Sequence, residues 1–119
     1  MVGGLDEDRL LEQMEEIDRL NGELKGITVL KGIEVDILED GALDLADSVL
    51  SKLDLVIGSI HSHFKYPSEK QTERVLRAMD HPHFTMFAHP TGRLLLEREP
   101  YEIDLPRVIR HASQRGCFI

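Results

Sequence analysis

The sequence has one cysteine, no tryptophan, no long apolar run and few basic residues. A single cysteine, Cys117, cannot form an internal disulfide, which favours a reducing, cytoplasmic location. No apolar run approaches the roughly 20 residues of a transmembrane helix, so no membrane partner is expected. The 14 basic and 22 acidic residues give a net charge of −8, whereas nonspecific nucleic-acid binding requires a basic surface.

Motifs of several enzyme classes are also absent. The chain has no glycine-rich phosphate loop, no Gly-x-Ser-x-Gly motif and no Cys-x-x-Cys pair, which argues against a P-loop enzyme, an α/β-hydrolase and a cysteine-ligated zinc site. The composition, with 41% hydrophobic and 30% charged residues, is that of an ordinary globular protein. At 119 residues the chain has room for one domain, residues 1–119.

Helical and extended patterns alternate along the chain. Apolar spacing and breakers predict helices over residues 6–24, 44–52, 68–79 and 104–115. Ser68 and Gln71 form an expected capping box, and Gly116 is expected to end the last helix. Apolar runs predict strands over residues 28–38, 55–60 and 84–88, and a fourth that starts at 117–119. This alternation indicates an α/β fold with a parallel sheet or barrel.

Three residues that can bind metal lie on or directly after the predicted strands. Glu34 alternates with apolar neighbours in the first strand and is expected to face inward, where an unpaired carboxylate would be costly. His61 follows the second predicted strand, 27 residues after Glu34, and His89 follows the third, 28 residues after His61. Successive parallel strands would bring one ligand each to a shared edge, where catalytic groups gather in barrels. Carboxylate and imidazole suit zinc, manganese or iron.

Each of these residues also fits a simpler role when it is taken alone. Glu34 fits a surface carboxylate on an edge strand, and either histidine fits a hydrogen-bonded structural residue. Only the combination of all three residues at the strand ends favours a metal site. His63 fits a residue that lines the same site or a structural residue, and Arg93 fits either solvated surface or a phosphate contact.

Three segments carry a resemblance to a known superfamily. Residues 32–37 (GIEVDI), 59–64 (SIHSHF) and 88–93 (AHPTGR) closely resemble the PHP domain, the polymerase and histidinol phosphatase superfamily. Residues 69–74 (EKQTER) and 93–101 are similar to the PHP domain of bacterial family X DNA polymerases. The resemblance runs along essentially the whole chain.

The resemblance implies a fold, a metal site and an activity. The fold would be the central part of a distorted (β/α)7 PHP barrel, with about four strands and intervening helices and up to three zinc or manganese ions at the strand ends. Glu34 would bridge two metals, and His61 and His89 would be further ligands. The family hydrolyses phosphodiester or phosphomonoester bonds with a metal-activated water, as in a 3′–5′ exonuclease. Arg93 and His63 would then be candidate substrate-binding residues.

The sequence departs from the family pattern at both ends. The family's opening His-x-His pair would precede Gly3 and its closing Asp-x-His would follow Ile119, so residues 1–119 are expected to form a partial PHP domain. Three hypotheses remain open: a segment of an enzyme that acts on a DNA 3′ end in the complete protein, an isolated fragment without a complete site that acts only as a structural or interaction module, and a histidinol-phosphate phosphatase-like enzyme with a small phosphoester substrate. For residues 1–119 by themselves an incomplete site is expected. A partial barrel would expose sheet edges, so a homo-oligomer is expected.

Overall fold

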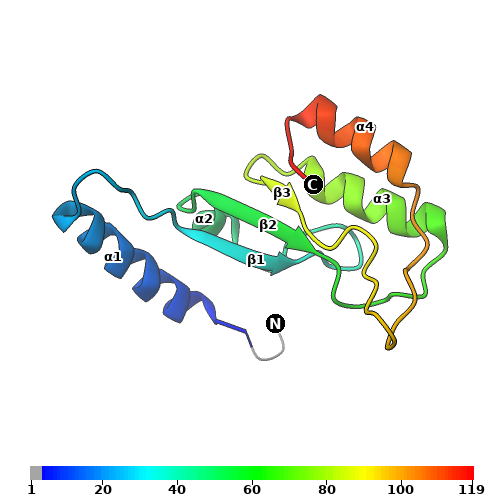
Figure 1. The fold of residues 1–119 in the computed structure, drawn as a ribbon, viewed down its shortest axis with the longest axis horizontal. Helices are drawn as coiled ribbons and strands as arrows, with labels where there is room; N and C mark the ends of the chain where they lie inside the picture. Colours follow the sequence, from blue (N-terminus) through cyan, green and yellow to red (C-terminus); the bar gives the residue numbers. More distant parts are fainter. Residues whose placement is uncertain (1–3) are drawn as a thin grey trace.

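Helices and strands alternate in the computed structural model, which describes residues 4–119 (Figure 1). The helices are α1 (Glu7–Glu23), α2 (Asp47–Leu50), α3 (Ser68–Met79) and α4 (Leu105–Arg115). The strands are β1 (Gly32–Asp36), β2 (Leu55–Ser59) and β3 (Met86–Phe87). The predicted α/β class is confirmed, and so is the end of α4 at Gly116, which takes a left-handed φ of 72°.

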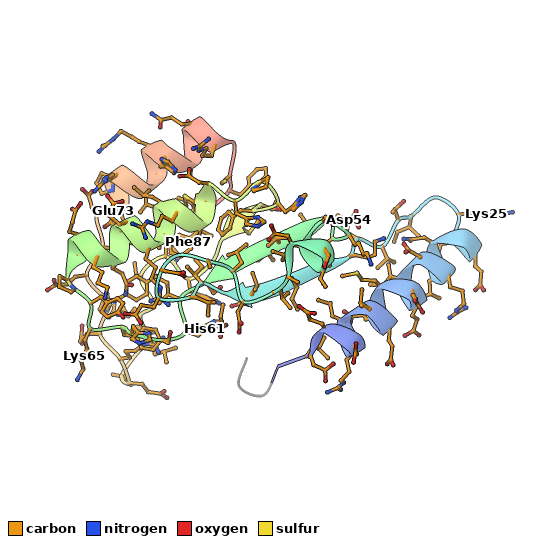
Figure 2. All side chains as sticks on the ribbon, turned by 180° about the vertical axis from the view of Figure 1, so that it is seen from behind. Lys25, Asp54, His61, Lys65, Glu73 and Phe87 are labelled. Atoms are coloured by element: carbon orange, nitrogen blue, oxygen red, sulfur yellow. The ribbon has the colours of Figure 1, made fainter. Side chains whose placement is uncertain are left out.

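The three strands form one parallel sheet in the order β1-β2-β3. Glu34 pairs with Ile57, which in turn pairs with Met86. The strand expected from residue 117 is present only as a single parallel bridge between Phe118 and Met86. Because the strands are parallel, their carboxyl ends all lie at the same end of the sheet, which we call its carboxyl edge. Figure 2 shows His61 beyond this edge, with Asp54 at the opposite end of the sheet.

Strand β1 is shorter than the predicted strand over residues 28–38, and the prediction is wrong at both ends. Before β1, the backbone N–H of Val29 donates to Asn21 Oδ1 at 2.8 Å, and the Val29 carbonyl accepts from Asn21 Nδ2 at 2.9 Å. This side-chain amide takes the place of a neighbouring strand. After β1, the N–H of Ile37 still donates to the Ser59 carbonyl at 2.8 Å, but Ile37 pairs in an isolated antiparallel bridge with Leu43 and does not extend the parallel ladder. Apolar periodicity reveals neither interaction.

The predicted capping box of α3 is wrong. Pro67 is the N-cap residue and makes no side-chain capping bond, while Ser68 is already the first residue of the helix. Gln71 is fully buried, and its side-chain amide donates to the His63 carbonyl at 3.3 Å. Its carbonyl oxygen accepts from Arg74. Gln71 therefore belongs to a buried polar network that joins α3 to the segment after β2, which is why it does not cap the helix.

One face of the sheet carries the main hydrophobic core under α3 and α4 (Figure 1). Val35, Val56 and Phe87 contribute from the three strands, with Val75 of α3 and Val108 of α4. Phe87 lies between the sheet and α3 in Figure 2. These side chains are at most 1% exposed, so the strands that lead to the predicted site are held by close packing.

The molecule is elongated, because α1 projects away from the rest (Figure 1). Leu10 and Met14 of α1 pack with Val49 of α2 in a separate small cluster. The radius of gyration is 15.6 Å, compared with about 13.5 Å expected for a compact domain of this length. None of the helices within residues 4–119 is long and apolar enough to cross a membrane.

Candidate functional site

Glu34, His61 and His89 come together at the carboxyl edge of the sheet, and we call them the Glu34 cluster. Oε1 of Glu34 lies 3.1 Å from Nε2 of His61 and 3.4 Å from Nε2 of His89. The centroids of the two imidazole rings are 6.5 Å apart. Each residue comes from a different strand or the segment after it, so parallel pairing brings together side chains that are far apart in sequence.

The inward orientation expected for Glu34 is wrong. Its side chain is 42% exposed. Val35 and Ile37 of the same chain segment are buried under the helices, whereas Glu34 points to the opposite face of the sheet, which is open to solvent. The carboxylate is therefore accessible to an ion or a substrate from solution.

Asp36 is a site residue that the sequence reasoning missed. Its Oδ1 lies 2.5 Å from Nδ1 of His61. A carboxylate oxygen accepts hydrogen bonds, so Nδ1 of His61 is the donor and Nε2 is the atom directed towards Glu34. Metal-binding histidines commonly have a carboxylate in this position. The available signal was the alternation along β1, which places Asp36 on the same face of the strand as Glu34.

The segment that carries His89 is held in an uncommon backbone conformation. His89 has a positive φ of 51°, and such strained residues cluster at functional sites. The hydroxyl of Tyr101 donates to the His89 carbonyl at 2.9 Å. Burial raises the pKa of Tyr101, which keeps this hydroxyl a donor. Gly92 packs on the same ring, where an added Cβ would lie 2.3 Å from a ring carbon.

A cavity of about 230 Å³ lies next to the two cluster histidines, and we call it the His89 cavity. Besides His61 and His89, its lining residues are Ile60, Gly92, Arg93, Leu94 and Arg98. The structure thus places Arg93, the predicted phosphate contact, beside the Glu34 cluster. A larger cavity of about 420 Å³ lies between α3 and α4, away from the strand ends.

His63 lies close to the site in sequence but points elsewhere. Its ring stacks on Tyr66 with 5.0 Å between the centroids, and its Nδ1 is 3.1 Å from the Ser62 hydroxyl oxygen. Within the part of the chain that the structure describes, His63 makes no hydrogen bond or ring contact with the Glu34 cluster. A role for His63 in substrate binding stays a prediction.

Arg74 of α3 ties together the two segments that follow β1 and β2. Its side chain is 2% exposed, and its guanidinium donates to the carbonyls of Ile37, Leu38 and Ser62. It also donates to Gln71 Oε1 at 3.2 Å. Burial lowers the pKa of Arg74, but a guanidinium remains charged in proteins. Asp36 and His61 directly precede the carbonyls that Arg74 holds, so Arg74 supports the edge of the sheet where the cluster lies.

The Glu34 cluster has the donor chemistry of a metal site but not its arrangement. Across residues 4–119, no group of three or more His, Cys, Asp and Glu side chains already has the arrangement of a metal site. In the cluster, the two imidazole nitrogens face one carboxylate oxygen directly, at hydrogen-bonding distances. Their chemistry, one carboxylate and two imidazoles, is nevertheless that of zinc and manganese ligands. That Glu34, His61 and His89 bind such an ion stays a prediction.

The chain is similar to enzymes that process phosphate esters. It is 46% identical over 119 residues, its whole length, to the DNA polymerase/3′-5′ exonuclease PolX of Bacillus subtilis. It is 36% identical over 100 residues, 81% of the chain, to a probable phosphatase of Thermoanaerobacter sp., and 36% identical over 99 residues to one of Syntrophotalea carbinolica. No protein-family model matches the chain.

The predicted resemblance to the PHP domain of bacterial family X DNA polymerases is confirmed by the match to PolX. The chain spans 21% of the length of PolX and 38% of the Thermoanaerobacter phosphatase. The activities of these longer proteins are therefore properties of the relatives, and they bear on this chain only as proposals.

Proposed function

We propose that the chain is a segment of a metal-dependent phosphoesterase, namely part of the 3′–5′ exonuclease domain of a family X DNA polymerase. The observation that carries this proposal is the convergence of Glu34, His61 and His89 at the carboxyl edge of a parallel sheet. The whole-length similarity to PolX supports it. In this proposal residues 1–119 form the central part of a PHP barrel, and residues 1–3 lie outside the described structure.

Each residue of the site would have its own role in phosphoester hydrolysis. Glu34, His61 and His89 would hold zinc or manganese, which supplies a water of lowered pKa and neutralises charge on the phosphoryl group. Asp36 would orient the His61 ring through its hydrogen bond to Nδ1. Arg93 lies beside the two histidines and would bind a phosphoryl oxygen. A DNA 3′ end would be the substrate in a cytoplasmic protein.

A hydrolysis assay tests this proposal. The chain, within a protein that completes the barrel, is incubated with Mn²⁺ or Zn²⁺ and a 5′-labelled single-stranded oligonucleotide. We expect stepwise shortening from the 3′ end, which is lost in a His61→Ala/His89→Ala variant and kept in His83→Ala, a control at an exposed histidine outside the site. Unchanged hydrolysis in the double variant would contradict the assignment of the site. No hydrolysis by the wild type would favour an isolated structural or interaction module.

A second candidate function is hydrolysis of a small phosphomonoester. The similarity to probable phosphatases over 81% of the chain favours it. Histidinol phosphate and p-nitrophenyl phosphate are the substrates that test it beside the oligonucleotide. Faster turnover of either monoester than of DNA ends would select this phosphatase function over the exonuclease.

We also propose that the chain self-associates through exposed apolar side chains. Leu95 and Leu96 are 74% and 108% exposed in a turn beside the His89 cavity, and Phe118 at the β3 edge is 63% exposed. Such surface and an open sheet edge favour association. Sedimentation velocity over a wide concentration range should show a rising average mass, which a Leu95→Ser/Leu96→Ser variant lowers. A monomer at every concentration would contradict this proposal.

A further inference from the structure

We propose that the His89 cavity binds the phosphate group of a single nucleotide or sugar phosphate, with Arg98 as its anion-binding residue. Ile60 and Leu94 would contact the organic part of this ligand. The inference rests on the proposed function, because the cavity would deliver the ester to His61 and His89, which line its wall. It assigns a binding role to Arg98 and a ligand class to the cavity.

Arg98 is held in place before any ligand arrives. Its Nε donates to the Gly92 carbonyl at 2.7 Å, and its guanidinium carbon lies 3.9 Å from the centroid of the Phe64 ring. Its backbone exchanges two hydrogen bonds of 2.9 Å with Leu94, which closes the turn between them. Because a fixed guanidinium loses little conformational entropy on binding, Arg98 is suited to bidentate hydrogen bonding to phosphate oxygens.

The positive charge of the His89 cavity is not neutralised by neighbouring carboxylates. Within residues 4–119, neither Arg93 nor Arg98 forms an ion pair, and neither Nη atom of Arg98 makes a hydrogen bond. In the larger cavity between α3 and α4, by contrast, Arg107 already pairs with Glu69 and Glu73. Arg77 and Arg110 also line the larger cavity, but so do the carboxylates of Glu73 and Asp80, whereas among residues 4–119 no carboxylate lines the His89 cavity.

The dimensions and walls of the cavity define the rest of the ligand. Its volume of about 230 Å³ lies below the roughly 300–1,000 Å³ of sites for drug-sized ligands, so it has room for one phosphate and the sugar attached to it, and a longer strand would extend beyond it. Ile60 is buried and Leu94 is 47% exposed, which provides an apolar contact for a sugar or base edge. Both a DNA terminal nucleotide and a free sugar phosphate have this chemistry.

Titrations followed by NMR test this assignment without added metal. Inorganic phosphate, deoxythymidine monophosphate, ribose 5-phosphate and a short single-stranded oligodeoxynucleotide are added separately to the chain, and the amide signals of Gly92 and Leu94 are followed. We expect deoxythymidine monophosphate to shift these signals at lower concentration than inorganic phosphate. Equal binding of the oligonucleotide would identify a DNA terminus as the source, and equal binding of ribose 5-phosphate a free sugar phosphate.

Two variants and one control complete the test. Arg98→Gln should weaken binding of deoxythymidine monophosphate about tenfold or more, as expected for loss of a charged hydrogen bond. Leu94→Glu, which adds a carboxylate at an exposed position, should weaken it similarly, whereas Arg110→Gln on α4 should not. Unchanged affinity in both cavity variants would overturn the proposal.

The outcomes for the cavity and for the proposed function are separable. Hydrolysis that continues in Arg98→Gln with unchanged KM would overturn the cavity assignment and leave the phosphoesterase proposal standing. Arg98-dependent binding of deoxythymidine monophosphate by a wild-type chain that hydrolyses no substrate would support the cavity and contradict the phosphoesterase proposal.

Discussion

Replacing Arg74 with methionine is expected to lower the free energy of unfolding by about 3–5 kcal/mol. Methionine fills similar space, so the loss comes from hydrogen bonds and not from a cavity. It leaves the buried carbonyl of Ile37 and the partly buried carbonyls of Leu38 and Ser62 without the guanidinium that they now accept from. Because small domains are stable by only about 5–15 kcal/mol, this change should bring the chain close to unfolding.

Urea denaturation followed by circular dichroism measures the effect of the Arg74 change. Arg77→Met is the matched control, since Arg77 lies on the same helix, is exposed and donates only to the Asp40 carbonyl at 3.3 Å. We expect the control to change stability by less than about 0.5 kcal/mol. Equal losses in the two variants would show that Arg74 does not hold the two strand ends together.

Changing Glu34 to glutamine should reduce phosphoester hydrolysis by more than about 100-fold, because loss of even an outer-shell partner of a metal ligand typically costs about 10–100-fold. The amide keeps the shape of the side chain but removes the negative charge that would hold a cation. Since the Glu34 side chain is 42% exposed, the melting temperature of the metal-free chain should change little.

Glu39→Gln provides the control for the Glu34 change. Glu39 is also an exposed carboxylate, and it pairs with Lys70 at 3.2 Å outside the cluster. Hydrogen bonds from Tyr66 and Lys70 lower the pKa of Glu39, but no site residue depends on it. Rates and melting temperature are measured for both variants. A Glu34→Gln enzyme that keeps most of the wild-type rate would remove Glu34 from the catalytic centre.

The positions of His61 and His89 could be predicted because they depend on chain order alone. Apolar runs identify buried strands, and a helix between them makes the strands parallel. A residue directly after each strand must then lie at the same edge of the sheet. The convergence of both histidines on Glu34 follows this expectation, although the barrel that the resemblance implies remains a proposal.

Side-chain partners that depend on loop conformation could not be predicted in the same way. The Asp36–His61 hydrogen bond requires a particular ring orientation, and the position of Arg98 over Phe64 requires the tight turn that starts at Leu94. The inward orientation predicted for Glu34 is wrong because alternation fixes the face of a strand but not whether that face is covered.

Metal content per purified chain, measured by elemental mass spectrometry, tests whether Glu34, His61 and His89 bind a metal ion. The wild-type chain is compared with the His61→Ala/His89→Ala variant after both are loaded with zinc or manganese and desalted. We expect bound metal in the wild type and its loss in the variant. Equal metal content in the two proteins, or no bound metal in the wild type, would contradict a metal site built from Glu34, His61 and His89.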